Sequence, residues 1–389
     1  MLLQKDKIAL SVKYVSVASL MLYMLQGVLY PGSMFVAKIF LAAYFAVGIF
    51  CLTEILFSGT KQALIYSALA FAMANIAYFG FSNGTAISTF YGIDPQSPIK
   101  QTIFVFLTLF IFFYLSKNKL IDKKLLIVVY TFWFAVGIVN FYSLSPFSPI
   151  YDKEVNNSGY IFVNILPFLL FFKRKYIAII LFIISSIIVI SSLKRGAILI
   201  LIAIIAYGVF IWTRTAKLSV MQKISIFLFG AIICTSLAIP AYNSNDAIQN
   251  RMSETLSGYS SGRDIIYQQL LDNWENEGCL TNAMFGYGYS YTPIVTGGQY
   301  AHNDWLELLT NMGLFGVGLY MLFILQIVAI TLCSTPDSIE RRCMVSIILI
   351  IIVKSVFSMG YGDQGTIPLM ILLGYVAGKN ELQKTIVGL

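Results

Sequence analysis

The sequence predicts an all-α polytopic membrane protein with about twelve transmembrane helices and a large helical loop on the outer side before the last three. Two observations predict this class. Of the 389 residues, 58% are hydrophobic and only 11% are charged, whereas soluble domains carry about 25% charged residues. The apolar residues also gather in runs long enough to cross a bilayer core about 30 Å thick. Together these observations exclude a soluble protein.

Each apolar run ends at polar or charged residues, which divides the chain into candidate spans. The twelve spans are 8–30, 34–57, 62–81, 99–115, 125–142, 160–172, 176–193, 196–212, 220–241, 311–332, 343–359 and 366–378. They are apolar on all sides, which separates them from amphipathic surface helices. The sixth is short and contains Pro167, which disfavours a continuous helix, so its ends are the least defined.

The distribution of basic residues orients these spans. Alternate connections, together with both termini, carry most of the 26 Lys and Arg residues, and positive charge is retained on the cytoplasmic side. We therefore expect both termini in the cytoplasm and no cleaved signal peptide. The net charge of +8 then reflects topology and contact with anionic lipid, and nucleic acid is not an expected partner. The outer side holds only Lys38, Lys100, Lys153, Lys194, Arg195, Arg251 and Arg263.

One outer connection, 242–301, is much longer than the others, and loops of that length are usually functional. Ser261-Gly262-Arg263-Asp264 is typical of a helix start, and Ile266, Leu270 and Trp274 then form one apolar face. The sequence therefore predicts three parts. Residues 1–241 form spans one to nine, 242–301 form a helical cap, and 302–389 form a re-entrant or amphipathic helix with spans ten to twelve.

The segment that follows the cap contains the single histidine, His302. If it forms one unbroken helix, the spacing of about 100° per residue separates two faces. One face carries His302, Leu309, Gly313, Gly316 and Tyr320, and the opposite face carries Asp304, Glu307 and Asn311. The two glycines on the first face would allow another helix to approach closely just below His302.

Three outer residues suggest a chemistry. Arg195 and Arg263 are permanently charged and present planar donors that match phosphate oxygens. His302 is the natural proton acceptor at neutral pH. Together they suit attack by a hydroxyl on a carbon that carries a lipid diphosphate.

Several patterns are absent from the sequence. No D-x-D pair on the outer side and no cysteine or histidine spacing suggests a metal site, and no Walker pattern suggests ATP, so we expect no cofactor. The ionisable residues within the spans are mainly Lys13, Glu54 and Lys354, each able to snorkel. This disfavours a proton-coupled carrier, which usually has a chain of buried ionisable groups.

Two motifs carry a family resemblance. Arg195-Gly196-Ala197-Ile198-Leu199 resembles the R-x₃-L motif of the O-antigen ligase and polymerase superfamily. His302-Asn303, followed after nine residues by Gly313-Leu314-Phe315-Gly316, resembles its H-[NSQ]-x₉-G-x-x-G motif. Ser261-Gly262-Arg263-Asp264 and Gly286-Tyr287-Gly288 are similar to segments of the family's large periplasmic loop. In motif terms the resemblance covers the C-terminal half, whereas the first 150 residues match in hydropathy only.

The resemblance implies a fold similar to the GT-C membrane glycosyltransferases and a metal-independent transfer of undecaprenyl-diphosphate-linked glycan. The reaction would invert the anomeric carbon at the periplasmic face of the bacterial inner membrane. Arg195 and Arg263 would bind the diphosphate and His302 would activate the acceptor hydroxyl. A polymerase transfers to another lipid-linked repeat unit, and a ligase transfers to lipid A-core. The acidic segment 302–307 is more similar to the polymerases of O-antigen or capsule, whose further expected partners are a chain-length regulator and a flippase.

Further candidate substrate-binding residues on the outer side are Lys194, Arg251, Tyr287, Asn303 and Asp363. Each candidate also has a structural interpretation. Arg195 can anchor a span at the interface, Arg263 can pair with a carboxylate of its own helix, and His302 can cap a helix. From a different functional class, a polysaccharide flippase or exporter remains an alternative, although its cavity should be lined by basic residues inside the spans.

Overall fold

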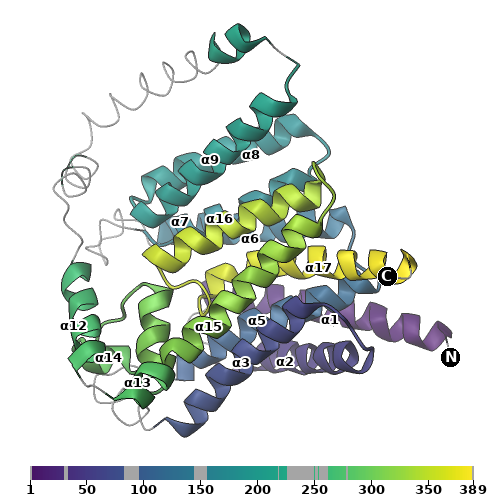
Figure 1. Ribbon diagram of the computed structural model, residues 1–389. Coiled ribbons are helices and arrows are strands. Elements are labelled where there is room, and N and C mark those ends of the chain that lie inside the picture. The colour runs from purple at the N-terminus through teal and green to yellow at the C-terminus, as the bar shows by residue number, and fades with distance from the viewer. Residues whose placement is uncertain are drawn as a thin grey trace.

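The structure, a computed structural model, describes residues 2–29, 34–82, 96–143, 156–217, 219–225, 249, 253, 262–276 and 279–387. Within these ranges every regular element is a helix and none is a strand. The predicted class, an all-α polytopic membrane protein, is confirmed (Figure 1).

Most predicted spans correspond to helices. The structure forms α1 (Leu2–Leu29), α2 (Met34–Phe57), α3 (Ala63–Phe81), α5 (Gln96–Lys117), α6 (Lys123–Ser143), α7 (Gly159–Ile165), η1 (Leu166–Phe171), α8 (Lys175–Ser191), α9 (Arg195–Thr215), α15 (Asp304–Cys333), α16 (Ile339–Phe357), η2 (Gln364–Thr366) and α17 (Ile367–Val387). Among the described residues, seven helices are long and apolar enough to cross a membrane, namely α1, α2, α3, α5, α6, α9 and α15. Of the predicted ninth span, only residues 220–225 are described, and they are helical.

The sixth predicted span forms a shorter and more buried element than its neighbours. The α-helix α7 passes directly into the 3-10 helix η1, which has Pro167 in its first turn. Proline cannot donate the hydrogen bond that would continue an α-helix, and the tighter 3-10 winding absorbs the change. Nearly all of this segment is buried, so it runs through protein and not along lipid.

The centre of the bundle is the contact between α5 and α17. A Cβ atom built on Gly374 would lie 2.6 Å from the carbonyl oxygen of Leu109, and one on Gly378 would lie 2.5 Å from that of Phe113. The two glycines are four residues apart on one face of α17, a spacing that allows two helix backbones to touch. The Ser116 hydroxyl donates across the same contact to the carbonyl oxygen of Tyr375 at 2.7 Å.

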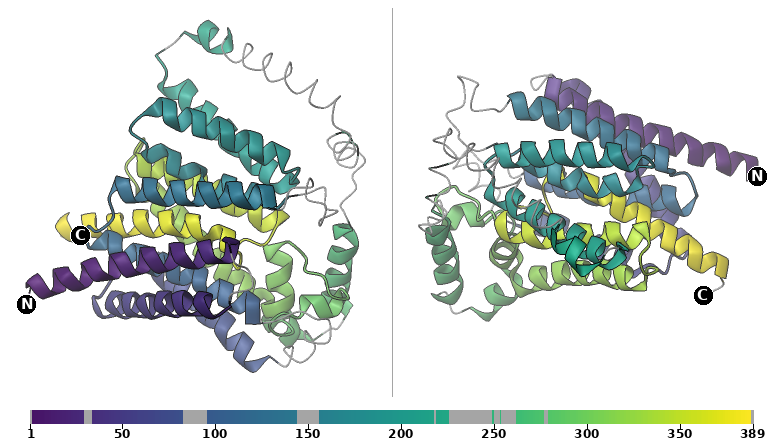
Figure 2. Two further views of the ribbon diagram at one scale, coloured as in Figure 1. Left: turned by 180° about the vertical axis from the view of Figure 1, so that it is seen from behind. Right: turned by 90° about the horizontal axis from the view of Figure 1, so that it is seen from above.

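Both chain ends lie at one end of this helix bundle (Figures 1 and 2). The short helices α12 (Arg263–Asn276), α13 (Leu280–Phe285) and α14 (Thr292–Val295) lie at the opposite end (Figure 2). α12 begins within the segment 261–264 that predicted a helix start, and its Ile266 and Leu270 are buried against Ala301, as the apolar face predicted. Trp274, the third residue of that face, is half-buried.

Candidate functional site

A break in α15 organises the end of the bundle opposite both chain termini. Gly313 has φ 62° and ψ −160°, so the helix is not continuous there. In an unbroken helix the carbonyl groups of Thr310 and Asn311 would accept hydrogen bonds from residues four positions later. Here they accept from the backbone amides of Tyr287 and Gly288, at 2.9 and 3.1 Å. Polar backbone at membrane depth requires such partners, and this loop supplies them.

The loop approaches so closely because glycines face each other. A Cβ on Gly313 would lie 2.6 Å from the amide nitrogen of Gly286, and a Cβ on Gly286 would lie 2.6 Å from the carbonyl oxygen of Asn311. The expected close approach at Gly313 is therefore present, although the C-terminal end of α13 and the following turn make it. At Gly316 the three atoms nearest to a built Cβ all belong to Met312 of the same helix, so the expected approach of a second helix there stays a prediction.

His302 precedes α15 and does not share a helical face with Leu309 or Tyr320, so the predicted stripe is wrong at this position. The helix begins at Asp304, and the Asn303 side chain caps it by accepting from the amides of Trp305 and Leu306 at 3.0 and 3.2 Å. On the other side of His302, Glu307 Oε1 accepts from the amide of Ala301 at 2.6 Å. Both neighbours of the histidine are thus fixed.

The backbone of His302 is strained, with φ 52°. A residue with a Cβ pays about 1–2 kcal/mol for this left-handed conformation. Strain of this kind gathers at functional sites and persists where neighbouring contacts enforce it. The hydrogen bonds of Ala301 and Asn303 provide that enforcement.

Asp304, expected on the face opposite Tyr320, instead accepts a hydrogen bond from it. Tyr320 Oη donates to Asp304 Oδ2 at 3.2 Å, and the Gly360 amide donates to both carboxylate oxygens at 2.8 and 3.0 Å. The break at Gly313 changes the direction of the helix, so positions assigned to opposite faces of a straight helix can meet. Asp304 is fully buried and joins α15 to the connection between α16 and α17.

Lys354 lies near the C-terminal end of α16, and its side chain does not snorkel. Its ammonium group donates to Asp363 Oδ2 at 2.6 Å and to Thr366 Oγ1 at 2.9 Å. The Lys354 side chain is 1% exposed, whereas that of Asp363 is 39% exposed. The ion pair therefore has a buried cation and an anion that remains open to the cavity described next.

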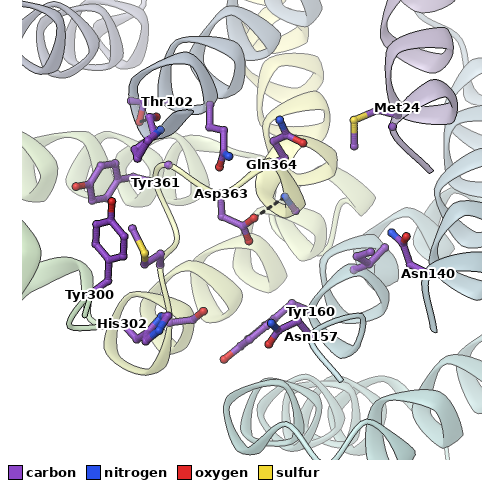
Figure 3. Close-up of a pocket in the computed structure, with 18 of the residues that line it drawn as sticks. Met24, Thr102, Asn140, Asn157, Tyr160, Tyr300, His302, Tyr361, Asp363 and Gln364 are labelled. Atoms are coloured by element: carbon purple, nitrogen blue, oxygen red, sulfur yellow. Dashed lines mark hydrogen bonds between the residues drawn. The ribbon is translucent and has the colours of Figure 1, made fainter. Parts of the chain in front are cut away.

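A cavity of about 990 Å³ opens at this end of the bundle. Its wall comes from the ends of α1, α2, α5, α6 and α15 that lie away from the chain termini, from the start of α7, from Lys194, and from the segments 289–302 and 358–365. Figure 3 shows His302 and Tyr300 on one side, Met24 and Asn140 on the other, and Asp363 between them. The volume is at the upper end of the range for small-molecule sites.

One side of the cavity is cationic. Lys194 and His302 both line it, and Arg263 lies close enough to affect the charge of the histidine. Arg263 donates to the carbonyl oxygen of Phe357 at 3.0 Å, at the C-terminal end of α16. The ammonium of Lys194 lies 5.9 Å from the ring centre of Tyr160, within range of a cation–π interaction.

This environment sets the protonation of His302. Partial removal from water, and then the positive charges of Arg263 and Lys194, lower the pKa of the imidazole from 6.5 to about 4. Both effects disfavour the charged form of the ring. The side chain is nevertheless open to the cavity, so a ligand can reach it. At neutral pH it is an uncharged imidazole with a nitrogen able to accept a proton.

The predicted site residues divide into two groups. Lys194, His302 and Asp363 line the cavity together. Arg195 is the first residue of α9, beside Lys194, and is not among the lining residues.

The other predicted residues lie outside the lining. Tyr287 stacks on Tyr291 with ring centres 5.0 Å apart and donates to the carbonyl oxygen of Asn273 at 3.1 Å. Asn303 is the helix cap. Arg251 lies outside the described residues.

Sequence reasoning missed most of the uncharged polar wall of the cavity, namely Gln26, Gln101, Asn140 and Asn157. Gln364, next to the predicted Asp363, completes this wall. Each of them stands close to the end of a predicted span, which is the one signal that could have drawn attention to them. Their convergence depends on contacts between distant helices, which the chain order does not reveal.

Comparison with protein families finds one match in this part of the chain. Residues 180–321 match the O-antigen ligase family. The match spans Arg195, Arg263, His302 and the Gly313 break, and it confirms the resemblance to the O-antigen ligase and polymerase superfamily. The O-antigen ligase match supports a ligase-type or polymerase-type function without separating the two. Comparison with curated proteins finds no match.

Proposed function

We propose that this protein is a membrane glycosyltransferase that uses a polyprenyl-diphosphate-linked glycan as donor, acting at the periplasmic face of a bacterial inner membrane. One observation carries the proposal. A neutral histidine shares a cavity with Lys194, beside Arg263, at the end of the bundle opposite both termini. A proton acceptor next to fixed cations suits displacement of a diphosphate by a hydroxyl.

In the proposed reaction, the acceptor hydroxyl oxygen attacks the anomeric carbon from the face opposite the diphosphate. A bond forms between that oxygen and the carbon, and the bond between the carbon and the diphosphate oxygen breaks. The leaving diphosphate keeps the electron pair, and Lys194, Arg195 and Arg263 stabilise its charge. His302 takes the proton of the hydroxyl, and the anomeric configuration inverts. Side-chain cations, and not a metal, neutralise the leaving group.

For the acceptor we propose the sugar of another lipid-linked repeat unit, which makes the protein an O-antigen or capsule polymerase. The similarity of segment 302–307 to the polymerases supports this choice, although Asp304 and Glu307 have structural partners. The second candidate is ligation to lipid A-core, which the description of the matching family favours.

A reconstitution experiment tests the proposed chemistry. Purified protein in liposomes is given lipid-linked repeat units and no other protein, and products are separated by size. Chain growth supports the polymerase. Transfer only when lipid A-core is added supports the ligase, and translocation of the lipid without new glycosidic bonds would overturn both in favour of a flippase.

Deletion in a native host with an outer membrane separates the two transferases. Loss of a polymerase should leave core capped with one repeat unit. Loss of a ligase should leave bare core and accumulated lipid-linked polymer. Gel electrophoresis of the lipopolysaccharide distinguishes these outcomes.

A further inference from the structure

Five carboxamide side chains from separate elements meet at the cavity. They are Gln26 of α1, Gln101 of α5, Asn140 of α6, Asn157 before α7 and Gln364 of η2, and we call them the amide cluster. Asn157 is exposed, and the other four are partly buried. Gln364 Nε2 donates to Tyr23 Oη at 3.4 Å. A carboxamide has two donor hydrogens and an acceptor oxygen, so a side chain that bonds within the protein can still bond a ligand in the cavity. The five amides on five elements give this part of the cavity a polar, uncharged wall.

The chemistry of the amide cluster differs from that of the cationic side. A carboxamide carries no charge, and it both donates and accepts hydrogen bonds. A sugar hydroxyl also does both, so the two groups are complementary whatever the orientation of the hydroxyl. A diphosphate has only acceptors and is better matched by arginine and lysine. The side chains of Tyr23 and Trp133 line the same part of the wall and add the apolar surface that a sugar ring can cover.

Figure 3 shows Asn140 and Met24 across the cavity from His302, with Asp363 and Gln364 between them. If the diphosphate of the donor binds at the cationic side, its negative charge is neutralised there. An acceptor sugar has only hydroxyl groups to offer within the cavity. Its attacking hydroxyl must reach His302, so the rest of the acceptor extends towards the amide cluster.

We propose that the amide cluster is the acceptor-sugar subsite, which binds the neutral, hydroxyl-bearing part of the acceptor glycan. This inference rests on the proposed glycosyl transfer for its placement of donor and acceptor. The subsite itself is a claim about saccharide binding, and binding can be measured without turnover.

Leucine variants remove the hydrogen bonds while keeping much of the side-chain volume. Gln101→Leu, Asn140→Leu and Gln364→Leu are compared with Gln383→Leu, which lies at the inner end of the bundle in a separate cavity. If a leucine variant fails to accumulate, the alanine variant at that position is measured in its place. Two quantities are determined: KM for the acceptor in the liposome reaction, and binding of the lipid-free repeat-unit oligosaccharide, released by mild acid, by saturation-transfer NMR.

Each cluster variant should raise the acceptor KM and weaken oligosaccharide binding roughly 2- to 12-fold, the effect of one lost hydrogen bond, with kcat little changed. Gln383→Leu should change neither. Unchanged KM and unchanged binding in all three variants would overturn the subsite, as would absence of oligosaccharide binding to the unaltered protein. If the oligosaccharide binds in a cluster-dependent way but no transfer occurs, the subsite stands and the proposed glycosyl transfer fails.

Discussion

The backbone amide of Tyr287 donates to the carbonyl oxygen of Thr310 over 2.9 Å. This hydrogen bond satisfies the Thr310 carbonyl oxygen, which the break at Gly313 removes from the hydrogen-bond pattern within α15. The two positions belong to segments that sequence reasoning had treated as separate motifs. Their backbone pairing fixes the loop that carries Tyr289, Tyr300 and His302 along the cavity.

Gly286→Ala should disrupt this pairing. Its Cβ would lie 2.6 Å from the Asn311 carbonyl oxygen, at a backbone φ of +73°. We expect lower thermal stability in detergent and loss of product. Gly297→Ala is the matched control, because Gly297 has φ +69° with nothing within 4 Å of its built Cβ. The Gly297→Ala variant should lose only about 1–2 kcal/mol of stability, the cost of a left-handed backbone conformation for a residue with a Cβ. Equal losses in both variants would contradict the steric explanation.

Asp304→Ala should lower stability as well as activity. The substitution leaves the buried Gly360 amide and the Tyr320 hydroxyl without this acceptor, at a cost of about 1–3 kcal/mol for an unsatisfied group. Thermal unfolding followed by size-exclusion chromatography measures the effect. Asp337→Ala removes a carboxylate that is 77% exposed and 3.8 Å from Arg342, and it should cost about 0–1 kcal/mol. An Asp304 variant of normal stability would instead indicate a direct role in the reaction.

The acid limb of kcat/KM should lie near pH 4 and not near 6.5, because the pKa of His302 is lowered to about 4. The neutral imidazole is the active form, so activity falls as pH drops through that value. Lys194→Met removes one of the positive charges that lower the pKa, so the limb should move to higher pH. Lys384→Met, in a separate cavity, should leave the limb unchanged. A limb that does not respond to Lys194 would argue against this electrostatic coupling.

His302→Ala and Arg195→Ala should abolish the polymer ladder without changing membrane abundance. A positioned base typically contributes 10²–10⁴-fold. Arg174→Ala, which removes an exposed cation at the N-terminal end of α8, is the control and should leave the ladder normal. Normal ladders in the His302 and Arg195 variants would refute the site assignment.

The Lys354–Asp363 pair should respond asymmetrically to substitution. Asp363→Asn leaves the ammonium of Lys354, whose side chain is 1% exposed, without its anion. Lys354→Met leaves Asp363, which is 39% exposed and can be solvated in the cavity. Breaking a buried pair costs about 3–5 kcal/mol when a buried charge remains. Asp363→Asn should therefore lower the melting temperature more than Lys354→Met, and the reverse order would show that Lys354 is solvated.

Local patterns predicted much of the fold. The apolar run 34–57 coincides with α2, and the start of α12 at Arg263 follows its Ser-Gly signal. These features depend on composition and on residues close in sequence. The topology prediction agrees with the placement of both termini at one end of the bundle, whereas the cytoplasmic assignment stays a prediction.

The site was predicted less completely, because its geometry depends on distant partners. The break at Gly313 needs the loop at Gly286, and the burial of Asp304 needs Gly360. A helical wheel assumes a straight helix and cannot contain either contact. His302, Lys194 and Asp363 were found through charge and position on the outer side, while the amide cluster carries no charge to mark it.

The wall of the cavity draws on residues from Tyr23 in the first helix to Gly365 just before the last. A ribosome delivers these helices to the membrane in order, from α1 to α17. A nascent chain therefore lacks Asp363 and Gln364 until synthesis is almost finished, and Asp304 has no Gly360 amide to accept from before that point. The cavity is therefore complete only when the last helix has been inserted, so a partly inserted chain lacks part of the cavity wall.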